Sequence, residues 1–213
     1  VSIKTKNELS EIIIPTIKKF MKDNSITIQS ISLLVVGCGP GSFTSIRAVI
    51  SAAKGIYLSN KHIKILGINS LAGLAMSALN EATKSKIEYI LTSIDTKRSD
   101  QFMQLFKVND CDKRLLPFSA INNIEPIKLE NFSVYIEKNK LMDENVLFVG
   151  YISNFLKIKS TKIKFCKEPT QTPDAFWVGK LGLYIKNNNI NYKNSKIAFD
   201  EFKPIYVRSP EIN

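Results

Sequence analysis

A short apolar run, a glycine-rich loop and a helical pattern follow one another, and this unit constrains the fold more than any other feature. Residues 31–36 are mostly apolar and β-branched, which is typical of a buried strand. Residues 37–42 contain three glycines, and a helical pattern then runs from about Phe43 to Leu58. Strand and helix patterns keep alternating as far as Ile94, which predicts an α/β lobe with parallel strands.

The flanking sequence predicts further elements. Apolar residues at helical spacing predict a first helix, which Asn7 can cap and Pro15 would kink or delay. A final helix should begin at Thr172-Pro173-Asp174, with a capping hydroxyl and a proline at its first position. On the final helix, the residues predicted to face inward are Phe176, Trp177, Leu181 and Tyr184. Further strands are predicted at 63–68, 87–94, 101–108, 132–136 and 145–149. The remaining predictions are a helix capped by Ser70 and an extended segment at 205–207.

We expect two lobes without a flexible linker between them. The N-terminal lobe would comprise residues 1–92 and carry the partner-binding helices discussed below. The C-terminal lobe would comprise residues 93–213, where the pattern of strands and helices is looser. This division leaves open a return of the C-terminal tail to the N-terminal lobe.

Composition narrows the class of protein. The net charge is +11, yet only four of the 30 basic residues are arginine, so a surface that reads nucleic acid directly is not expected. The three cysteines are widely spaced, which argues against a disulfide framework or a zinc site and fits a reducing compartment. No apolar run is long enough to span a bilayer. We therefore expect a cytoplasmic protein without a membrane association.

The glycine-rich loop allows two interpretations. Gly39, Pro40, Gly41 and Ser42 lie between a strand and a helix, where backbone N–H groups could hold an anion. The lysine of a phosphate-binding P-loop is absent after the last glycine, and Ser42 stands where a dinucleotide-binding fingerprint has its third glycine. The alternative interpretation is a turn permitted by glycine, with Ser42 capping the helix.

The helix after this loop has two faces to cover. Small residues recur along one face at Ala48, Ser51, Ala52 and Gly55. A second apolar stripe faces elsewhere and comprises Ile46, Val49, Ile50, Ala53 and Tyr57. One face suits the sheet of the same chain, and the other could receive a second helix, including one from another subunit.

Candidate catalytic residues are few. His62 is the only histidine and lies in a polar segment, so neither a metal pair nor a nucleophile–histidine dyad is expected. Asp95 follows a predicted strand and could hold magnesium, but a turn-capping role is the simpler interpretation. We expect Asp200 and Glu201 to be surface acids and Cys38 to be a small buried hydrophobe. The sequence predicts no catalytic residue, no metal site and no cofactor.

Residues 34–47 (LVVGCGPGSFTSIR) closely resemble a motif of the TsaB (YeaZ) family of tRNA threonylcarbamoyladenosine biosynthesis proteins. The resemblance continues at residues 53–55 (AKG), 67–71 (GINSL) and 204–208 (PIYVR), with looser matches between. It departs at Ser45, where the family usually has glycine. The family also opens with two strands and an Asp-Thr-Ser turn, whereas this sequence begins within what would be the third strand.

The resemblance implies the two-lobed fold of actin, Hsp70 and sugar kinases, with an N-terminal lobe lacking its first two strands. It implies a non-catalytic scaffold or activator that pairs with TsaD, binds the TsaE ATPase within that complex, meets tRNA only indirectly and can form a homodimer when alone. The partner surface implied for this chain comprises Leu9, Ile13, Ile17, Phe43, Thr44, Arg47, Ala48, Ser51 and Gly55.

Two other functions remain open at this point. A diverged ATP-hydrolysing or phosphotransfer enzyme of the same fold would use the 39–42 loop and Asp95. An independent RNA-binding module would instead bind tRNA tightly and in a salt-sensitive manner without any partner.

Overall fold

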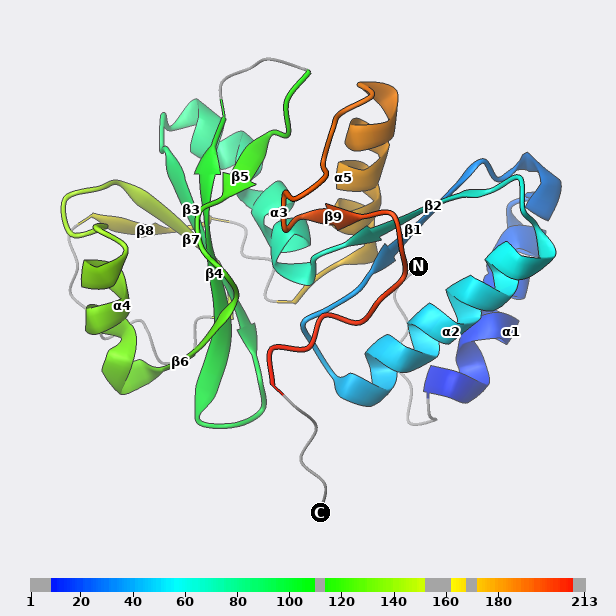
Figure 1. Cartoon of the computed structure of the whole chain (residues 1–213), viewed down its shortest axis with the longest axis horizontal. Helices are drawn as coiled ribbons and strands as arrows, with labels where there is room; N and C mark the ends of the chain where they lie inside the picture. Colours follow the sequence, from blue (N-terminus) through cyan, green and yellow to red (C-terminus); the bar gives the residue numbers. More distant parts are fainter. Residues whose placement is uncertain (1–8, 110–113, 152–161, 168–171, 209–213) are drawn as a thin grey trace.

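The computed structural model describes residues 9–109, 114–151, 162–167 and 172–208, and the fold it shows contains two β-sheets (Figure 1). The first sheet has the order β1-β2-β9. Strands β1 (Leu33–Gly37) and β2 (Lys64–Ile68) are parallel, and the helix α2 (Phe43–Ser59) connects them. The two-residue strand β9 (Ala198–Phe199) pairs antiparallel with β2, so the end of the chain returns to this sheet.

The second sheet is larger. Its order is β5-β4-β3-β7-β8, with β6 also paired to β4. Strand β3 is antiparallel to β4 and parallel to β7. The strands are β3 (Tyr89–Asp95), β4 (Asp100–Val108), β5 (Phe118–Ala120), β6 (Glu125–Lys128), β7 (Val146–Gly150) and β8 (Ile163–Phe165).

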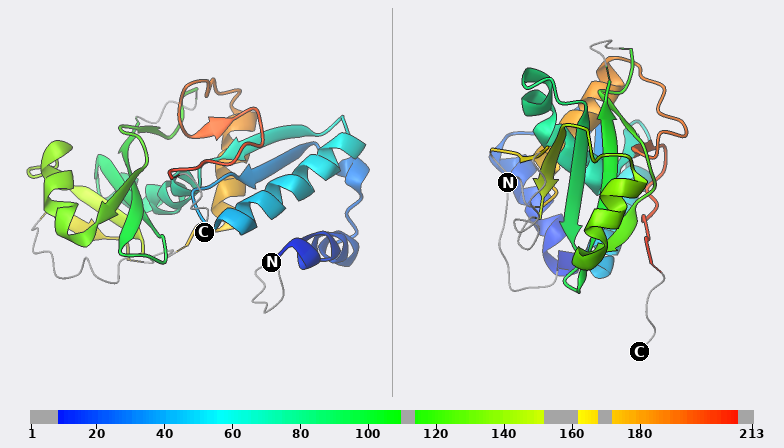
Figure 2. Two further views of the ribbon diagram at one scale, coloured as in Figure 1. Left: turned by 60° about the horizontal axis from the view of Figure 1, so that its bottom comes forward. Right: turned by 90° about the vertical axis from the view of Figure 1, so that its left-hand side faces the viewer.

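Helices cover both sheets (Figures 1 and 2). Helix α2 lies on one face of the first sheet with α1 packed against α2, and α5 packs on β1 and β2 from the other face. Helix α3 packs against α5 and the second sheet, while α4 covers the far side of that sheet. The remaining helices are α1 (Leu9–Asp23), α3 (Ser70–Lys84), α4 (Phe132–Lys138) and α5 (Ala175–Asn187), with short 3-10 turns η1 (Ile28–Ser30) and η2 (Leu129–Asn131).

Strand β1 holds the first lobe together because its alternate side chains enter two different cores. Val36 and Leu34 pack with Ile46 and Ile50 of α2 in one apolar cluster. Leu33 and Val35 face the other way, into the larger cluster that contains α3, α5 and part of the second sheet. The period-two alternation of a strand therefore joins the two helical layers through a single sheet.

Most predicted strands are confirmed, and several local predictions are wrong. Residues 132–136 belong to the helix α4 rather than to a strand. Asn69, not Ser70, caps α3, because its side chain accepts the Leu71 N–H at 2.9 Å. Asp174, not Thr172, caps α5 by accepting the Phe176 N–H at 2.6 Å.

Three other predictions concern the helices and the two ends of the chain. Phe176, predicted to face inward, is 58% exposed, whereas Leu181 is buried. Pro15 lies inside α1, so the helix does not start late. The predicted cap at Asn7 and the strand predicted at the start of the chain lie outside the described residues.

The division at residues 92–93 stays a prediction. In the structure β3 passes through that position as one strand of the second sheet. The large apolar cluster also joins residues from both sheets, so the two lobes share part of their core.

Two glycines of α5 provide a stability test of this packing. A Cβ added at Gly182 would lie 2.6 Å from a methyl carbon of Val35. At Gly179 it would meet no atom within 4 Å. We expect Gly182→Ala to lower the free energy of unfolding by about 1–3 kcal/mol through overpacking. Gly179→Ala, the matched control, should raise it by about 0.5–1 kcal/mol through helix propensity. Urea denaturation measures both, and an unchanged Gly182→Ala midpoint would contradict this packing.

Candidate docking site

Side chains and backbone of neighbouring segments pack closely against the glycine-rich loop. Gly39 has φ +105°, and a Cβ there would lie 2.9 Å from Ile46 Cδ1 and 3.1 Å from the Ile205 carbonyl oxygen. The Gly39 carbonyl accepts the Ser70 N–H at 2.7 Å. Ser42 caps α2, and its hydroxyl oxygen accepts the Ser45 N–H at a long 3.5 Å and the Ser45 hydroxyl at 3.1 Å. The capped-turn interpretation of this loop is therefore confirmed.

An apolar groove runs between α1 and α2. It consists of two adjoining hollows of about 490 and 520 Å³. Ile14, Ser51 and Ala52 line both hollows, and no residue of α1 is buried. The groove is lined at the start of α2 by Ser10, Ile13, Phe43, Thr44, Arg47 and Ala48, and at its end by Ile17, Lys18, Met21, Ile28, Gly55, Ile56, Ser59 and Asn60.

The two predicted faces of α2 have separate environments. Ile46, Ile50 and Ala53 are buried against the first sheet. The small-residue face is directed toward α1 of the same chain and lines the groove. An added Cβ at Gly55 would meet no atom within 4 Å, so α1 leaves this face partly open. Every residue of the predicted partner surface except Leu9 lines the groove.

An aromatic cluster stands at one end of the groove. The rings of Phe43 and Tyr206 stack with centroids 4.9 Å apart. The Arg47 guanidinium carbon lies 3.9 Å from the Phe43 centroid, and Arg47 Nε donates to the Tyr206 hydroxyl at 2.9 Å. Sequence reasoning placed Phe43 and Arg47 here but missed Tyr206, which lies 159 residues beyond Arg47. The only signal for it was its place within the motif at residues 204–208.

The segment of residues 202–208, which we term the C-terminal strap, ties the groove to both sheets. Phe202 is buried in the cluster beneath α2, and Ile205 donates its N–H to the Cys38 carbonyl at 2.8 Å. Farther along, Arg208 forms an ion pair with the largely buried Asp100 of β4. The strap therefore reaches from the first sheet to the second within a few residues.

The structure shows the surroundings of the candidate catalytic groups His62, Asp95 and Cys38. His62 is exposed. Asp95 accepts the backbone N–H and the ammonium of Lys97, each at 2.8 Å, which confirms a turn-capping role. Partial burial acts to raise the pKa of Asp95, but the hydrogen bonds and charge of Lys97 outweigh it and lower the pKa. Burial raises the pKa of the Cys38 thiol to about 11, so it stays protonated near neutral pH.

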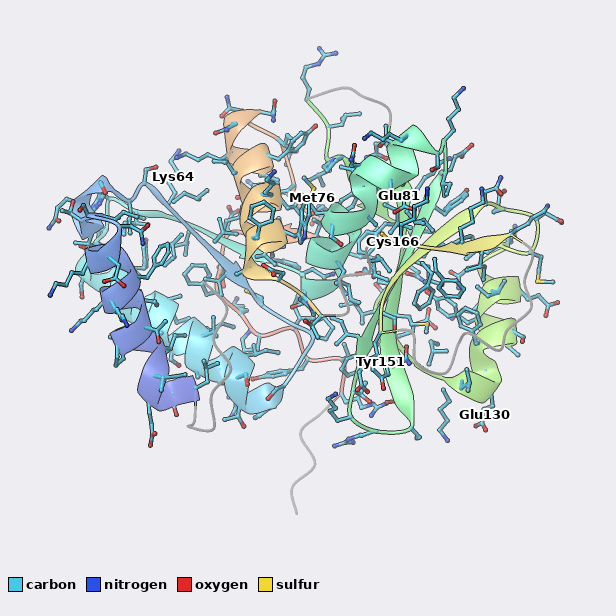
Figure 3. The ribbon with its side chains drawn as sticks, turned by 180° about the vertical axis from the view of Figure 1, so that it is seen from behind. Lys64, Met76, Glu81, Glu130, Tyr151 and Cys166 are labelled. Carbon is cyan, nitrogen blue, oxygen red and sulfur yellow. The ribbon has the colours of Figure 1, made fainter. Side chains whose placement is uncertain are left out.

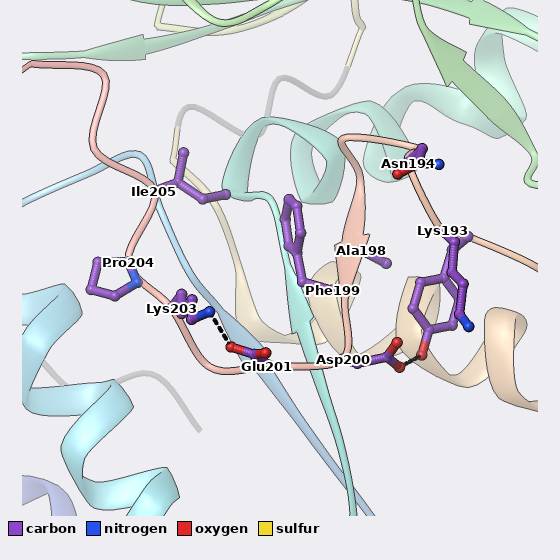
Figure 4. A pocket seen from close by; sticks show the side chains of 10 residues that line it. Lys193, Asn194, Ala198, Phe199, Asp200, Glu201, Lys203, Pro204 and Ile205 are labelled. Atoms are coloured by element: carbon purple, nitrogen blue, oxygen red, sulfur yellow. Dashed lines mark hydrogen bonds and ion pairs between the residues drawn. The ribbon is translucent and has the colours of Figure 1, made fainter.

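Two further polar clusters are internally paired. In Figure 3, Cys166 lies beside Glu81, whose carboxylate accepts from the thiol at 3.2 Å. A hollow of about 590 Å³ borders the strap (Figure 4). There Tyr192 donates to Asp200, and Lys203 pairs with Glu201. Among the residues that the structure describes, no group of three His, Cys, Asp or Glu side chains could hold a metal ion.

The fold and the site together define a class of protein. It is an α/β protein with two sheets and a groove between two surface helices, which is consistent with the actin, Hsp70 and sugar-kinase type of fold that the resemblance implies. YeaZ from Pseudomonas aeruginosa superimposes with a TM-score of 0.67 at 13% identity, covering 94% of this chain and 86% of YeaZ. A second solved structure is described as similar to peptidase YEAZ from the same organism. It superimposes with a TM-score of 0.67 at 14% identity, covering 93% of this chain and 83% of its own chain.

The family model described as TsaD, tRNA N6-adenosine threonylcarbamoyltransferase, matches residues 3–208. The chain belongs to this family. It is also similar to proteins that are named TsaB or YeaZ. The tRNA threonylcarbamoyladenosine biosynthesis protein TsaB of Buchnera aphidicola subsp. Schizaphis graminum is 37% identical over 43% of this chain and 42% of its own length. The TsaB protein of Escherichia coli is 28% identical over 45% of this chain and 39% of its own length. The chain thus spans about two fifths of the length of the curated relatives it matches.

No described helix is both long and apolar enough to cross a membrane.

The Arg208–Asp100 pair allows a test of the strap. Arg208→Gln would leave a largely buried carboxylate without its cation, so we expect unfolding free energy to fall by about 1–3 kcal/mol. Lys203→Gln is the matched control in the same strap, because it breaks an ion pair whose side chains are 77% and 62% exposed. That loss should be under about 1 kcal/mol. Equal losses in urea denaturation would contradict a structural role for the Arg208 pair.

Proposed function

We propose that this chain is a non-catalytic subunit in the threonylcarbamoyladenosine modification of tRNA, and that it docks through α1 and α2 on a TsaD homologue. The names of the curated relatives and the matching family model support the pathway. The α1–α2 groove carries the docking proposal, because it is an apolar surface feature built from small residues that permit close helix approach. We term the residues lining the groove the docking face.

In this proposal the chain acts in the cytoplasm, where docking would order the partner's active site. The TsaE ATPase would bind the resulting pair, and tRNA would meet the chain only through the complex. Free chains would form homodimers through the same docking face, so partner binding would compete with self-association.

The phosphotransfer alternative has less support. It would need the glycine-rich loop to cradle phosphate and Asp95 to hold a metal ion. Ser42 is instead engaged in capping α2, and the Asp95 carboxylate is engaged by Lys97. Titration of the isolated chain with ATP and magnesium tests this alternative directly, and saturable binding would favour it.

Substitution within the groove tests the docking proposal. Ala48 lines the groove, so Ala48→Arg should place a long charged side chain between the helices and weaken pairing with the TsaD homologue at least about tenfold. Light scattering on a sizing column, with each chain alone and then mixed, measures this pairing. The wild-type chain should give a species with one copy of each.

Val134→Arg is the matched control, since it adds the same side chain at a site on α4 that is already 62% exposed. It should pair as the wild type does. Circular dichroism should show that both variants remain folded. A wild-type mixture that elutes as two separate folded species would contradict the proposed function, and full pairing by Ala48→Arg would contradict the assigned face.

A further inference from the structure

The cluster at the end of the docking face holds an arginine in a fixed orientation. Phe43 supports the guanidinium from 3.9 Å, a distance suited to a cation–π contact. Tyr206 accepts the Nε–H at 2.9 Å and stacks on the same phenylalanine ring. These contacts occupy Nε and one face of the guanidinium. They leave the two terminal nitrogens as a pair of donors for a bidentate acceptor.

Within the part of the chain that the structure describes, Arg47 lacks a counter-charge. It is exposed, and among the described residues no carboxylate lies within ion-pair distance of it. The other charged residue among the described lining residues is also basic, since Lys18 lines the second hollow and none of the described lining residues of either hollow is acidic. An apolar groove with cations at both hollows is complementary to a helix with an apolar stripe and flanking carboxylates.

We propose that Phe43, Arg47 and Tyr206 form the anchor of the docking face, and that Arg47 binds a carboxylate on an amphipathic, acidic helix of the partner. This inference rests on the proposed function and adds the C-terminal strap to the docking surface. Tyr206 acts as a positioning residue, because it fixes the guanidinium plane before the partner arrives. The Tyr206 side chain is 43% exposed and so can contact a partner. Tyrosine and arginine are also among the residue types that dominate binding hot spots.

The affinity of the full chain for the TsaD homologue tests the anchor by isothermal titration calorimetry. Tyr206→Ala should weaken binding about tenfold or more, since it removes both the stacking ring and the acceptor for Nε. Tyr206→Phe keeps the ring but not the acceptor, so it should weaken binding by a smaller factor. Phe176→Ala is the matched control, because it removes a 58% exposed aromatic ring from α5, away from the groove. It should bind within about twofold of the wild type.

Salt dependence distinguishes an acidic partner from an apolar one. Binding of the wild-type chain should weaken as ionic strength rises, and Arg47→Gln should flatten that dependence as well as lower the affinity. An unchanged salt dependence in Arg47→Gln would overturn the acidic complement. Binding by Tyr206→Ala within about twofold of wild type would overturn the anchor.

The two proposals fail in different ways. If the wild-type chain does not bind the TsaD homologue, the proposed function and the anchor both fall. If the wild type binds and Ala48→Arg does not, while Tyr206→Ala binds as tightly as the wild type, only the anchor falls. Tyr206→Phe guards against an effect on folding, because it preserves the ring that stacks on Phe43.

Discussion

The architecture depends on one five-residue strand, β1, which is packed on both faces. Its even-numbered side chains, Leu34 and Val36, support α2, and its odd-numbered ones, Leu33 and Val35, support α5 and the large shared core. The close approach of Gly182 to Val35 shows how little space separates α5 from the strand. Because α2 rests on the same strand, the position of the docking face is set by the core rather than by surface loops.

The C-terminal strap extends this dependence to the second lobe. It fills the underside of α2 with Phe202, hydrogen-bonds to the loop before α2 through Ile205, and reaches β4 through Arg208. Tyr206 lies between these attachments and contacts Arg47. Arg47, a surface residue of the docking face, is therefore held by a segment whose two ends are fixed on different sheets.

Local patterns predicted the strands β1, β2, β3, β4 and β7 and the unusual two-faced character of α2, because period and residue size depend only on neighbouring residues. They did not predict the short strands β5, β6, β8 and β9. They failed where two nearby groups compete for one role. Asn69 and Ser70 can both cap a helix, and the buried Asn69 does so while also donating to Gln104 at 2.7 Å. Residues 132–136 looked like a strand because they are apolar, yet Phe132, Tyr135 and Ile136 recur at helical spacing and are buried. Tyr206 could not be assigned, since no local pattern reveals a contact across 159 residues.

The weakest part of the docking face is α1, and this has an energetic consequence. An isolated helix of 15 residues is marginal in water, and α1 has no buried residue to compensate. Its neighbour α2, by contrast, buries Ile46, Ile50 and Ala53 against the sheet. A partner helix in the groove would cover the half-buried Ile13 and Ile17 and so stabilise α1 as it binds. Part of the binding free energy would then go into ordering α1, while α2 and the strap provide the preformed half of the surface.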